Sequence, residues 1–298
     1  MRRRLELRLP FMSKPLPLAI SLATALALTA HASDLLPDTL HSPALGAELK
    51  FTIYLPDAYK DAPPTTRFPV VYLLHGAGGD ETVWAKTLGA VQTLDGLIKR
   101  GVIRPMIAVM PTTGPHTWWT DSAAAKAGTA VMRDLLPYVD GKYRTLAERS
   151  GRLVAGYSMG GYGALSLALR HPERFCAAGL ISPAVYDPLP PEASAARKAP
   201  AFQRAGAFDP AAWKALNHPA QLARYSSGPH RVPMWIVSGD HDALGIALAS
   251  TQLFWKLFQL QPKQTELRIV DGDHEAMTFR DALPDALQYM DQQCSRAP

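Results

Sequence analysis

Cysteine is scarce in this chain, which has only Cys176 and Cys294 among its 298 residues. Neither belongs to a clustered cysteine and histidine spacing, so the sequence offers no zinc site and we expect no bound metal. Cys176 lies in the apolar run Phe175–Ile181, and Cys294 stands four residues from the end. An oxidising compartment would permit a disulfide, but these positions favour two unpaired thiols.

The N-terminal segment lacks an apolar run long enough to cross a membrane. Its apolar stretch, Leu18–Leu28, holds eleven residues, well short of the roughly 20 that span a bilayer. Five basic residues precede this stretch, and Ala-His-Ala follows at residues 30–32. This order is typical of a secretory signal peptide with cleavage after Ala32. We therefore expect residues 33–298 to act in the periplasm or outside the cell, without a stable membrane anchor.

An excess of one charge is also missing once this segment is set aside. Residues 1–32 hold five of the 31 basic residues and one of the 26 acidic residues, which leaves 26 basic against 25 acidic side chains. The remaining chain has no basic cluster, so we expect neither nucleic acid nor an anionic membrane as a partner. Its 266 residues, in a sequence that is 47% hydrophobic, can bury the core of one domain.

Apolar stretches of strand length alternate with segments of helix length. The expected strands are residues 49–55, 69–74, 106–110, 153–156, 176–182, 234–237 and 267–270. The expected helices are residues 81–99, 123–138, 159–170, 244–260 and 281–292. Such alternation indicates an α/β fold with a mostly parallel central sheet and helices on both faces. Sheets of this kind bind ligands at the carboxyl ends of their strands.

One long stretch breaks this alternation. Residues 184–230 are rich in proline and alanine, carry several aromatic side chains and show only short helix signals such as residues 210–216. Long connections in compact enzymes commonly shape a binding site. We therefore expect one domain over residues 33–298, with a cap or lid inserted at residues 184–230.

The sequence Gly156-Tyr157-Ser158-Met159-Gly160 lies between an expected strand and an expected helix. A serine on such a sharp turn is held in a strained backbone conformation that exposes its hydroxyl, and the flanking glycines let the chain fold that tightly. A glycine-rich turn with an incidental serine explains the five residues alone. The strand before them and the helix after them favour Ser158 as a nucleophile.

A serine nucleophile needs a base, and the base needs a carboxylate that orients it. On α/β folds these groups commonly follow in the chain order Ser, Asp or Glu, His. His274 lies between the last expected strand and the last expected helix, which favours it as the base. The loop after residues 234–237 offers two carboxylates. We favour Asp242 because the loop needs a few residues to curl toward the histidine, and we expect Asp240 to bind amides of its own loop.

Acyl transfer also requires two backbone amides that stabilise the negative charge on the former carbonyl oxygen. The residue after the nucleophile, Met159, supplies one amide in such sites. The glycine-rich loop His75–Gly79 follows an earlier strand, and we expect Ala77 to supply the second amide. His75 precedes the serine in the chain, so we expect it to brace this loop by hydrogen bonding.

These motifs together resemble the esterase-D-like putative esterase family of α/β-hydrolases over about residues 49–289. That family includes feruloyl and short-chain carboxylesterases, S-formylglutathione hydrolases and secreted mycolyltransferases. The motifs that carry the resemblance are Val70–Gly76, Trp118–Ser122, Gly156–Ala164, Gly239–Asp242 and Gly272–Glu275.

The resemblance implies an α/β-hydrolase fold, no cofactor, and the roles given above for the nucleophile, acid, base and amide donors. It also implies that Trp118 and Trp119 line the substrate cleft, although core packing explains at least one of them equally well. Ala77 stands where several relatives carry a larger apolar residue, so the shape of the acyl pocket does not follow from the resemblance. The expected export fits poorly with S-formylglutathione hydrolysis, which is cytosolic.

The sequence therefore predicts an exported serine carboxylesterase that cleaves a small-molecule ester through an acyl-enzyme on Ser158. An acyltransferase that passes the same acyl group to a sugar or lipid alcohol is the alternative, because a fold does not decide what intercepts the intermediate. A non-catalytic binding protein on an esterase scaffold is a third hypothesis.

Overall fold

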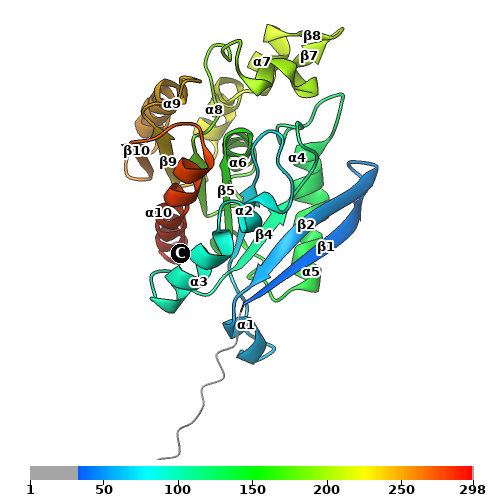
Figure 1. Cartoon of the computed structure of the whole chain (residues 1–298), viewed down its shortest axis with the longest axis vertical. Helices are drawn as coiled ribbons and strands as arrows, with labels where there is room; N and C mark the ends of the chain where they lie inside the picture. Colours follow the sequence, from blue (N-terminus) through cyan, green and yellow to red (C-terminus); the bar gives the residue numbers. More distant parts are fainter. Residues whose placement is uncertain (1–32, 297–298) are drawn as a thin grey trace, which may run out of the picture. The chain divides into compact units, whose positions relative to one another are not determined.

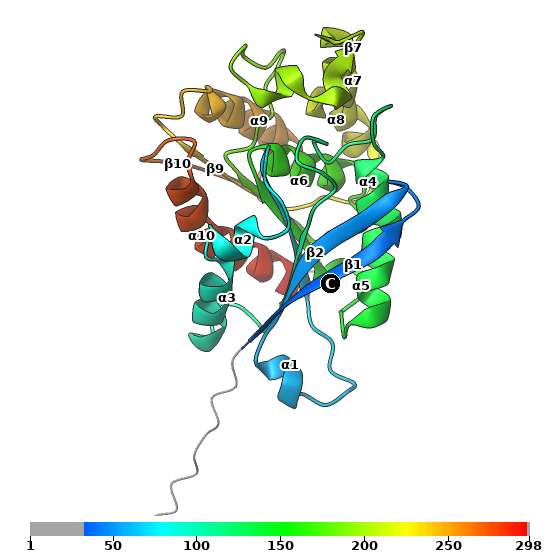
Figure 2. The ribbon, with the colours of Figure 1, turned by 45° about the vertical axis from the view of Figure 1, so that its right-hand side comes forward.

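An eight-stranded sheet forms the centre of the computed structural model, which describes residues 33–296 (Figures 1 and 2). The predicted signal peptide, residues 1–32, lies outside the described residues. In spatial order the strands are β1 (Asp34–Ser42), β2 (Ala47–Leu55), β4 (Ile107–Pro111), β3 (Val70–Leu74), β5 (Arg152–Tyr157), β6 (Ala177–Ile181), β9 (Met234–Gly239) and β10 (Thr265–Val270). The neighbours from β4 to β10 are parallel, whereas β1 pairs with β2 and β2 with β4 antiparallel.

The seven predicted strands are all present, and the predicted fold class is confirmed. Every residue of β3, β4, β5, β6 and β9 is buried, because helices cover both faces of the sheet. That burial explains the continuous apolar runs in the sequence. The eighth strand, β1, was not predicted, since most of its residues are exposed or half-exposed and Pro37 interrupts its pattern.

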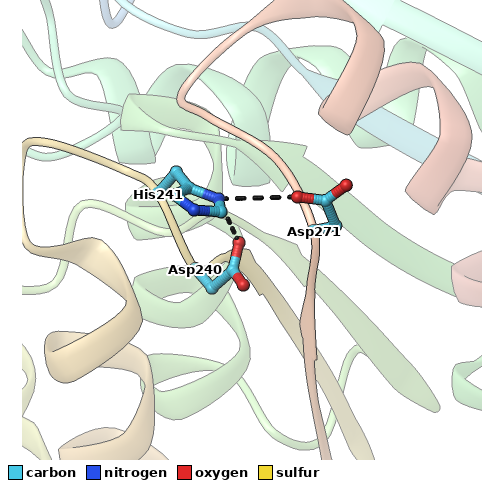
Figure 3. Close-up of side chains that lie close together, drawn as sticks. All are labelled: Asp240, His241 and Asp271. Carbon is cyan, nitrogen blue, oxygen red and sulfur yellow. Dashed lines mark ion pairs between the residues drawn. The ribbon is translucent and has the colours of Figure 1, made fainter.

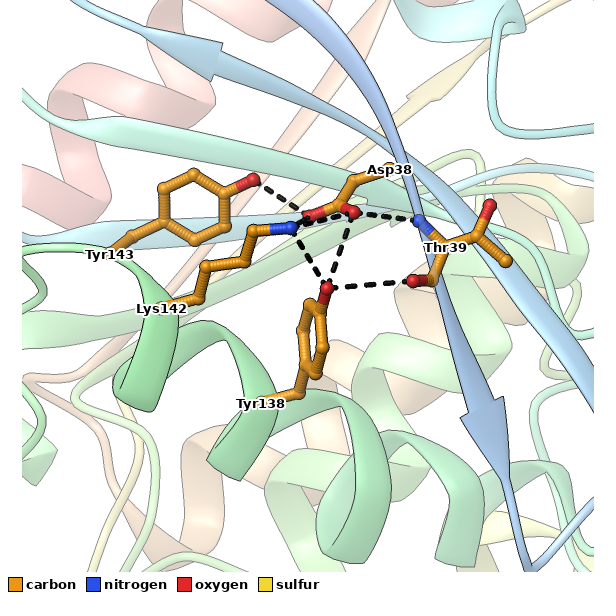
Figure 4. A network of polar contacts seen from close by, with 5 residues as sticks. All are labelled: Asp38, Thr39, Tyr138, Lys142 and Tyr143. Atoms are coloured by element: carbon orange, nitrogen blue, oxygen red, sulfur yellow. Dashed lines mark hydrogen bonds and ion pairs between the residues drawn. The ribbon is translucent and has the colours of Figure 1, made fainter.

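A polar network fixes β1 to the helical layer (Figure 4). Asp38 accepts hydrogen bonds from Lys142 Nζ at 2.8 Å, from Tyr143 Oη at 2.7 Å and from the Thr39 amide at 2.9 Å, and Tyr138 Oη lies 3.3 Å away. Burial raises the pKa of Asp38, but these hydrogen bonds outweigh burial and leave the pKa below its ordinary value. The carboxylate therefore stays ionised and holds the edge strand in place.

Helices pack on both faces of the sheet and enclose two apolar cores. One core lies under α3 and α10, and the other under α5, α6 and α9. The helices are α1 (Ala58–Asp61), α2 (Val83–Lys86), α3 (Ala90–Lys99), α4 (Ala127–Thr129), α5 (Leu136–Lys142), α6 (Met159–Arg170), α7 (Pro210–Leu216), α8 (His218–Ser227), α9 (Ile246–Leu260) and α10 (Ala276–Ser295), with a π-helical turn, η1 (Ala130–Leu135), between α4 and α5.

Four helix predictions differ from the structure in extent. The helix predicted over residues 244–260, α9, begins two residues later, at Ile246. The helix predicted over residues 81–99 is divided into α2 and α3, because Gly89 adopts a left-handed conformation with φ of 63°. The segment predicted over residues 123–138 is divided into α4, η1 and α5. The last helix, predicted over residues 281–292, runs from Ala276 to Ser295 and contains Pro284 in its interior.

The expectation of two unpaired thiols is wrong, because Cys176 and Cys294 form a disulfide. Helix α10 packs along β6 and continues to Ser295, so Cys294 is part of a docked helix rather than a free tail. Its end therefore meets the residue just before β6, with a Cα–Cα distance of 5.2 Å. Both cysteines are buried.

Residues 184–230 contain short elements that lie beyond the carboxyl end of the sheet (Figure 1). They comprise the 3₁₀ turns η3 (Ala195–Lys198) and η4 (Pro200–Phe202), the two-stranded β7 (Gln203–Arg204) and β8 (Ala207–Phe208), and helices α7 and α8. Helix α8 packs on α6, which follows the candidate nucleophile. Among residues 33–296, no helix combines the length and the apolar character needed to cross a membrane.

Candidate active site

Ser158 lies on a sharp turn between β5 and α6. Its φ of 54° and ψ of −120° are strained for a residue with a side chain, and its amide donates to Ile181 O at 2.9 Å. Gly160 allows this turn to pack against the neighbouring strand, because a Cβ atom there would stand 2.1 Å from Leu74 O. The backbone therefore has the geometry of a nucleophile elbow.

Ser158, His274 and Asp242 form a continuous hydrogen-bonded chain. His274 Nε2 lies 2.9 Å from Ser158 Oγ, and His274 Nδ1 lies 2.7 Å from Asp242 Oδ2. The Asp242 side chain is fully buried, and its Oδ1 also accepts from the Leu244 amide at 3.0 Å. The loops after the parallel strands β9 and β10 lie side by side, which brings the carboxylate to the histidine.

Asp240, the other carboxylate of the same loop, points to a different partner (Figure 3). Asp240 Oδ1 lies 2.8 Å from His241 Nδ1 and accepts from the Gly272 amide at 3.2 Å. Asp271 lies 3.5 Å from the same His241 nitrogen. These three exposed side chains are the one group of three or more potential metal ligands found among residues 33–296, and the His241 ring lies within 4 Å of both carboxylates. Asp240 thus binds an amide of the neighbouring loop, not amides of its own loop as predicted, and makes no hydrogen bond or ion pair with His274.

The two predicted amide donors lie in segments that leave their N–H groups available. Met159 is the first residue of α6, where amides have no partner within the helix. The Ala77 amide has no hydrogen-bond acceptor among residues 33–296, whereas the next amide, of Gly78, donates to Pro115 O at 2.8 Å.

His75 braces the loop that carries Ala77. The ring is fully buried, with Nδ1 at 2.8 Å from Gly76 O and Nε2 at 3.0 Å from Thr112 Oγ1. Burial lowers its pKa below the ordinary value, which favours a neutral ring. The neutral imidazole therefore holds the loop by hydrogen bonds, and it does not touch Ser158.

A pocket with a volume of about 340 Å³ opens over Ser158 and His274. Trp118 is part of its wall, and the predicted cap contributes Tyr186 and residues 193–195. Its other lining residues are Ala77, Tyr157, Ala184, Leu244 and Phe279. The site is therefore an open cleft with largely apolar and aromatic walls around one hydroxyl and one imidazole.

Trp119, predicted to line the cleft with Trp118, is instead part of the packing behind it. It is fully buried, its Nε1 donates to His75 O at 3.1 Å, and its side chain packs directly against Gly163 of α6. Both tryptophans have positive φ values, 57° and 53°, so consecutive side chains leave the backbone in directions that an ordinary strand or turn would not give. Trp118 is thus part of the pocket wall, and Trp119 packs behind it and supports the loop of His75.

Sequence reasoning missed three wall residues that the structure brings to the pocket. Tyr157 directly precedes the nucleophile, and its ring stacks on Phe279 with centroids 4.6 Å apart. Phe279 also meets the His274 ring edge-to-face at 5.0 Å. The spacing of Phe279 one helical turn into α10 was a usable signal, since α10 starts directly after the His274 loop. No sequence pattern pointed to Leu244.

The chain matches the protein family described as Putative esterase over residues 42–290. An esterase of Mycobacterium tuberculosis is 35% identical over 142 residues, which cover 45% of this chain and 29% of that protein. The endo-1,4-beta-xylanase/feruloyl esterase of Xylanibacter ruminicola is 33% identical over 156 residues, which cover 50% of this chain and 22% of that protein. The matched segments therefore span less than a third of these relatives.

Solved structures share the fold along most of the chain. A ferulic acid esterase has a TM-score of 0.73 at 24% identity, with 88% of this chain and 99% of that chain covered. An esterase of Anaeromyces mucronatus in complex with ferulic acid has a TM-score of 0.67 at 18% identity, with 89% and 93% covered. The fold is that of the α/β-hydrolases, and the family match over residues 42–290 identifies the chain as a member of the Putative esterase family.

Proposed function

We propose that this chain is an exported serine carboxylesterase that cleaves a small ester through an acyl-enzyme on Ser158. The observation that carries the proposal is the hydrogen-bonded order of Ser158 Oγ, His274 and Asp242, with contacts of 2.9 and 2.7 Å. Ser158 and His274 both line the same pocket. This is the arrangement that a hydroxyl needs to become a nucleophile near neutral pH.

The first step transfers one proton and forms one bond. The Ser158 hydroxyl donates its proton to His274 Nε2 while Oγ attacks the ester carbonyl carbon. His274 Nδ1–H donates to Asp242, whose buried carboxylate holds the ring orientation and stabilises the imidazolium. The imidazolium then gives its proton to the departing alcohol, which leaves an acyl group on Ser158.

The negative charge on the former carbonyl oxygen is stabilised in this proposal by the amides of Ala77 and Met159. Each comes from rigid backbone, since His75 fixes one loop and α6 begins at the other residue. The loss of one such donor typically costs about 3 kcal/mol in the transition state, or a hundredfold in rate. Water activated by His274 then releases the acid and restores Ser158.

The proposed substrate is an ester with a short or planar acyl group. A cleft of about 340 Å³ with aromatic walls suits both kinds, and relatives named as feruloyl esterases favour the planar kind. Residues 184–230 act in this proposal as the cap that limits acyl size, since Tyr186 and residues 193–195 come from them. A panel of p-nitrophenyl esters of graded acyl length, together with methyl ferulate, tests the preference by kcat/KM.

Export is the second component of the proposal. The basic and apolar order of residues 1–32 is that of a signal peptide. The buried disulfide between Cys176 and Cys294 fits an oxidising compartment, since such bonds are rare in the cytosol. We therefore propose the periplasm or the medium as the place of action, and fractionation of cells that express the full chain tests it.

A fluorophosphonate probe and two serine substitutions test the chemistry. We expect the probe to label the wild-type protein at Ser158, and Ser158→Ala to abolish labelling and to lower turnover of p-nitrophenyl acetate on the order of a millionfold. Ser166→Ala, on the same helix but outside the pocket, is the matched control and should keep both. A wild-type protein that resists the probe would contradict the proposal and favour a non-catalytic binding protein.

An assay with added alcohols and sugars tests the fate of the acyl-enzyme. Hydrolysis predicts that the free acid remains the main product at modest acceptor concentration. Dominant transfer products would keep Ser158 as the nucleophile but would make the protein an acyltransferase.

A further inference from the structure

The two edges of the sheet are protected to different degrees. At one edge, β1 contains Pro37, which cannot donate a hydrogen bond to an added strand, and Asp38 ties β1 to α5. At the other edge, β10 pairs only with β9 and contains no proline. Its last residues, Ile269 and Val270, are 45% and 38% exposed. An unpaired apolar strand of this kind is a template for another strand.

The charges along β10 are arranged so that the strand complements itself. In an antiparallel pair of two identical strands centred on Leu267, Glu266 of each copy stands opposite Arg268 of the other. Both side chains are exposed or half-exposed, and residues directly opposite in antiparallel strands lie about 5 Å apart. One two-fold axis therefore produces two ion pairs of opposite charge.

Neighbouring registers lack this match. A shift by one residue leaves neither Glu266 nor Arg268 opposite another charge and reverses which face each side chain meets. A shift of the axis onto residue 266 or onto residue 268 places two glutamates or two arginines opposite each other. Like charges directly opposite destabilise a strand pair. The sequence of β10 thus favours one register and disfavours the alternatives.

Helix α9 lies beside the same edge (Figures 1 and 2). It carries three exposed apolar side chains. Leu248, Trp255 and Phe258 are 65%, 59% and 38% exposed, and the Trp255 and Phe258 rings are nearly parallel. α9 packs over β9 and β10, so in the symmetric pair two copies of α9 are separated by about two strand spacings, or ~10 Å. That is the distance at which helices pack.

On the opposite face of the sheet, α10 leaves β10 largely uncovered. α10 packs mainly over β6, β9 and β5, and a groove of about 370 Å³ bordered by Val270 and Met277 separates it from β10. Met277 is 57% exposed at this border. The edge is therefore open on one face and bordered by an apolar helix on the other.

We propose that β10 pairs antiparallel with β10 of a second copy of this chain, about a two-fold axis through Leu267, and that the two sheets become one sheet of sixteen strands. The contact is isologous, so each ion pair occurs twice and the assembly closes as a dimer. The active-site clefts lie outside this contact. Dimerisation does not depend on esterase activity, and either proposal can fail without the other.

Charge reversal at the strand tests the register. We expect the purified protein to sediment as a dimer from micromolar concentration upward. Arg268→Glu and Glu266→Arg each create like-charge contacts across the axis, so each should weaken dimerisation on the order of a hundredfold. The double variant Glu266→Arg/Arg268→Glu restores opposite charges in the same register and should restore the dimer.

Lys214→Glu, at an exposed position of α7, carries the same charge change away from the edge and should leave the dimer intact. Circular dichroism of each variant checks that it is folded. A wild-type protein that remains monomeric at high micromolar concentration would overturn the proposal, and so would a dimer that survives both single reversals. A double variant that stays monomeric while folded would exclude the register.

Discussion

At the scale of single residues, two carboxylates in one loop differ in what they can do. Asp242 is buried and bound to His274, whereas Asp240 is exposed and bound to His241 and the Gly272 amide. An asparagine at position 242 could present an amide donor to His274 and favour the wrong tautomer. We expect Asp242→Asn to lower kcat about ten-thousandfold and Asp240→Asn less than about tenfold.

Steady-state kinetics on p-nitrophenyl acetate measures both effects. Because the two substitutions make the same chemical change in one loop, each is the control for the other. A larger loss from Asp240→Asn than from Asp242→Asn would show that Asp242 is not the acid of the site.

Gly163 lies so close to Trp119 that the position has no space for a side chain. A Cβ atom at this position would lie 2.5 Å from Cβ of Trp119 and 2.6 Å from its Cγ, and Trp119 is fully buried and hydrogen-bonded to His75. The indole therefore cannot move aside without shifting the loop of Ala77. We expect Gly163→Ala to lower the free energy of unfolding by about 1–3 kcal/mol.

Gly141 in α5 is the matched control, because a Cβ atom there meets nothing within 4 Å. Gly141→Ala should instead raise stability by about 0.5–1 kcal/mol, since alanine is the better helix former. Urea denaturation of both variants measures the difference. Equal effects of the two substitutions would show that contact with Trp119 does not decide the outcome.

At the scale of elements, the sequence predicted the strands that are buried on both faces, because such strands appear as continuous apolar runs. The inner strands were found because most of their residues are apolar, and α6 was found with its correct ends, residues 159–170. β1 was not predicted because its side chains are mostly exposed and their partners lie in α5, about 100 residues away in the sequence. The position of Trp119 behind the pocket wall was not predicted, because two consecutive positive φ values depend on tertiary packing.

Helix α8 begins at a histidine that the folded chain keeps neutral. His218 is buried at the helix start, with Nδ1 3.2 Å from Asn217 Oδ1. Burial is the main cause that lowers its pKa to about 3; nearby Lys256 acts in the same direction, and Asp187 opposes both. The unfolded chain protonates this ring near pH 6.5, so it binds one more proton than the folded chain between about pH 3 and 6.5. The stability from the neutral ring is complete above this range and falls as the pH falls.

We therefore expect His218→Gln to flatten the acid dependence of stability. Between pH 6 and pH 4 the wild-type free energy of unfolding should fall by about 1.4 kcal/mol more per pH unit than that of the variant. Urea denaturation at a series of pH values measures the slopes. His230→Gln, at an exposed histidine, is the control and should retain the wild-type slope. Parallel slopes for wild type and His218→Gln would refute the argument.

At the scale of the whole molecule, the site depends on parts that are far apart in the chain. Ser158 and His274 are separated by 116 positions. They meet because the loops that follow the parallel strands β5 and β10 both lie at the carboxyl end of the sheet. The helix after His274, α10, carries Phe279 into the pocket wall at one end and Cys294 into the disulfide at the other. The disulfide thus anchors the element that directly follows the catalytic base of the proposal.

Removal of that disulfide should destabilise the molecule as a whole. The bridge between Cys176 and Cys294 joins residues 118 positions apart, and closure of a loop of that length removes unfolded-state entropy worth about 4–5 kcal/mol. We expect Cys176→Ser/Cys294→Ser to lose about this much stability in urea, and a reducing agent to lower the wild-type unfolding midpoint in the same direction. The reducing agent should leave the double variant unchanged, which separates loss of the bond from nonspecific effects. If reduction left the wild-type midpoint unchanged under conditions that a thiol assay shows to open the bond, packing of α10 alone would fix the end of the chain, and the bond would not stabilise the fold.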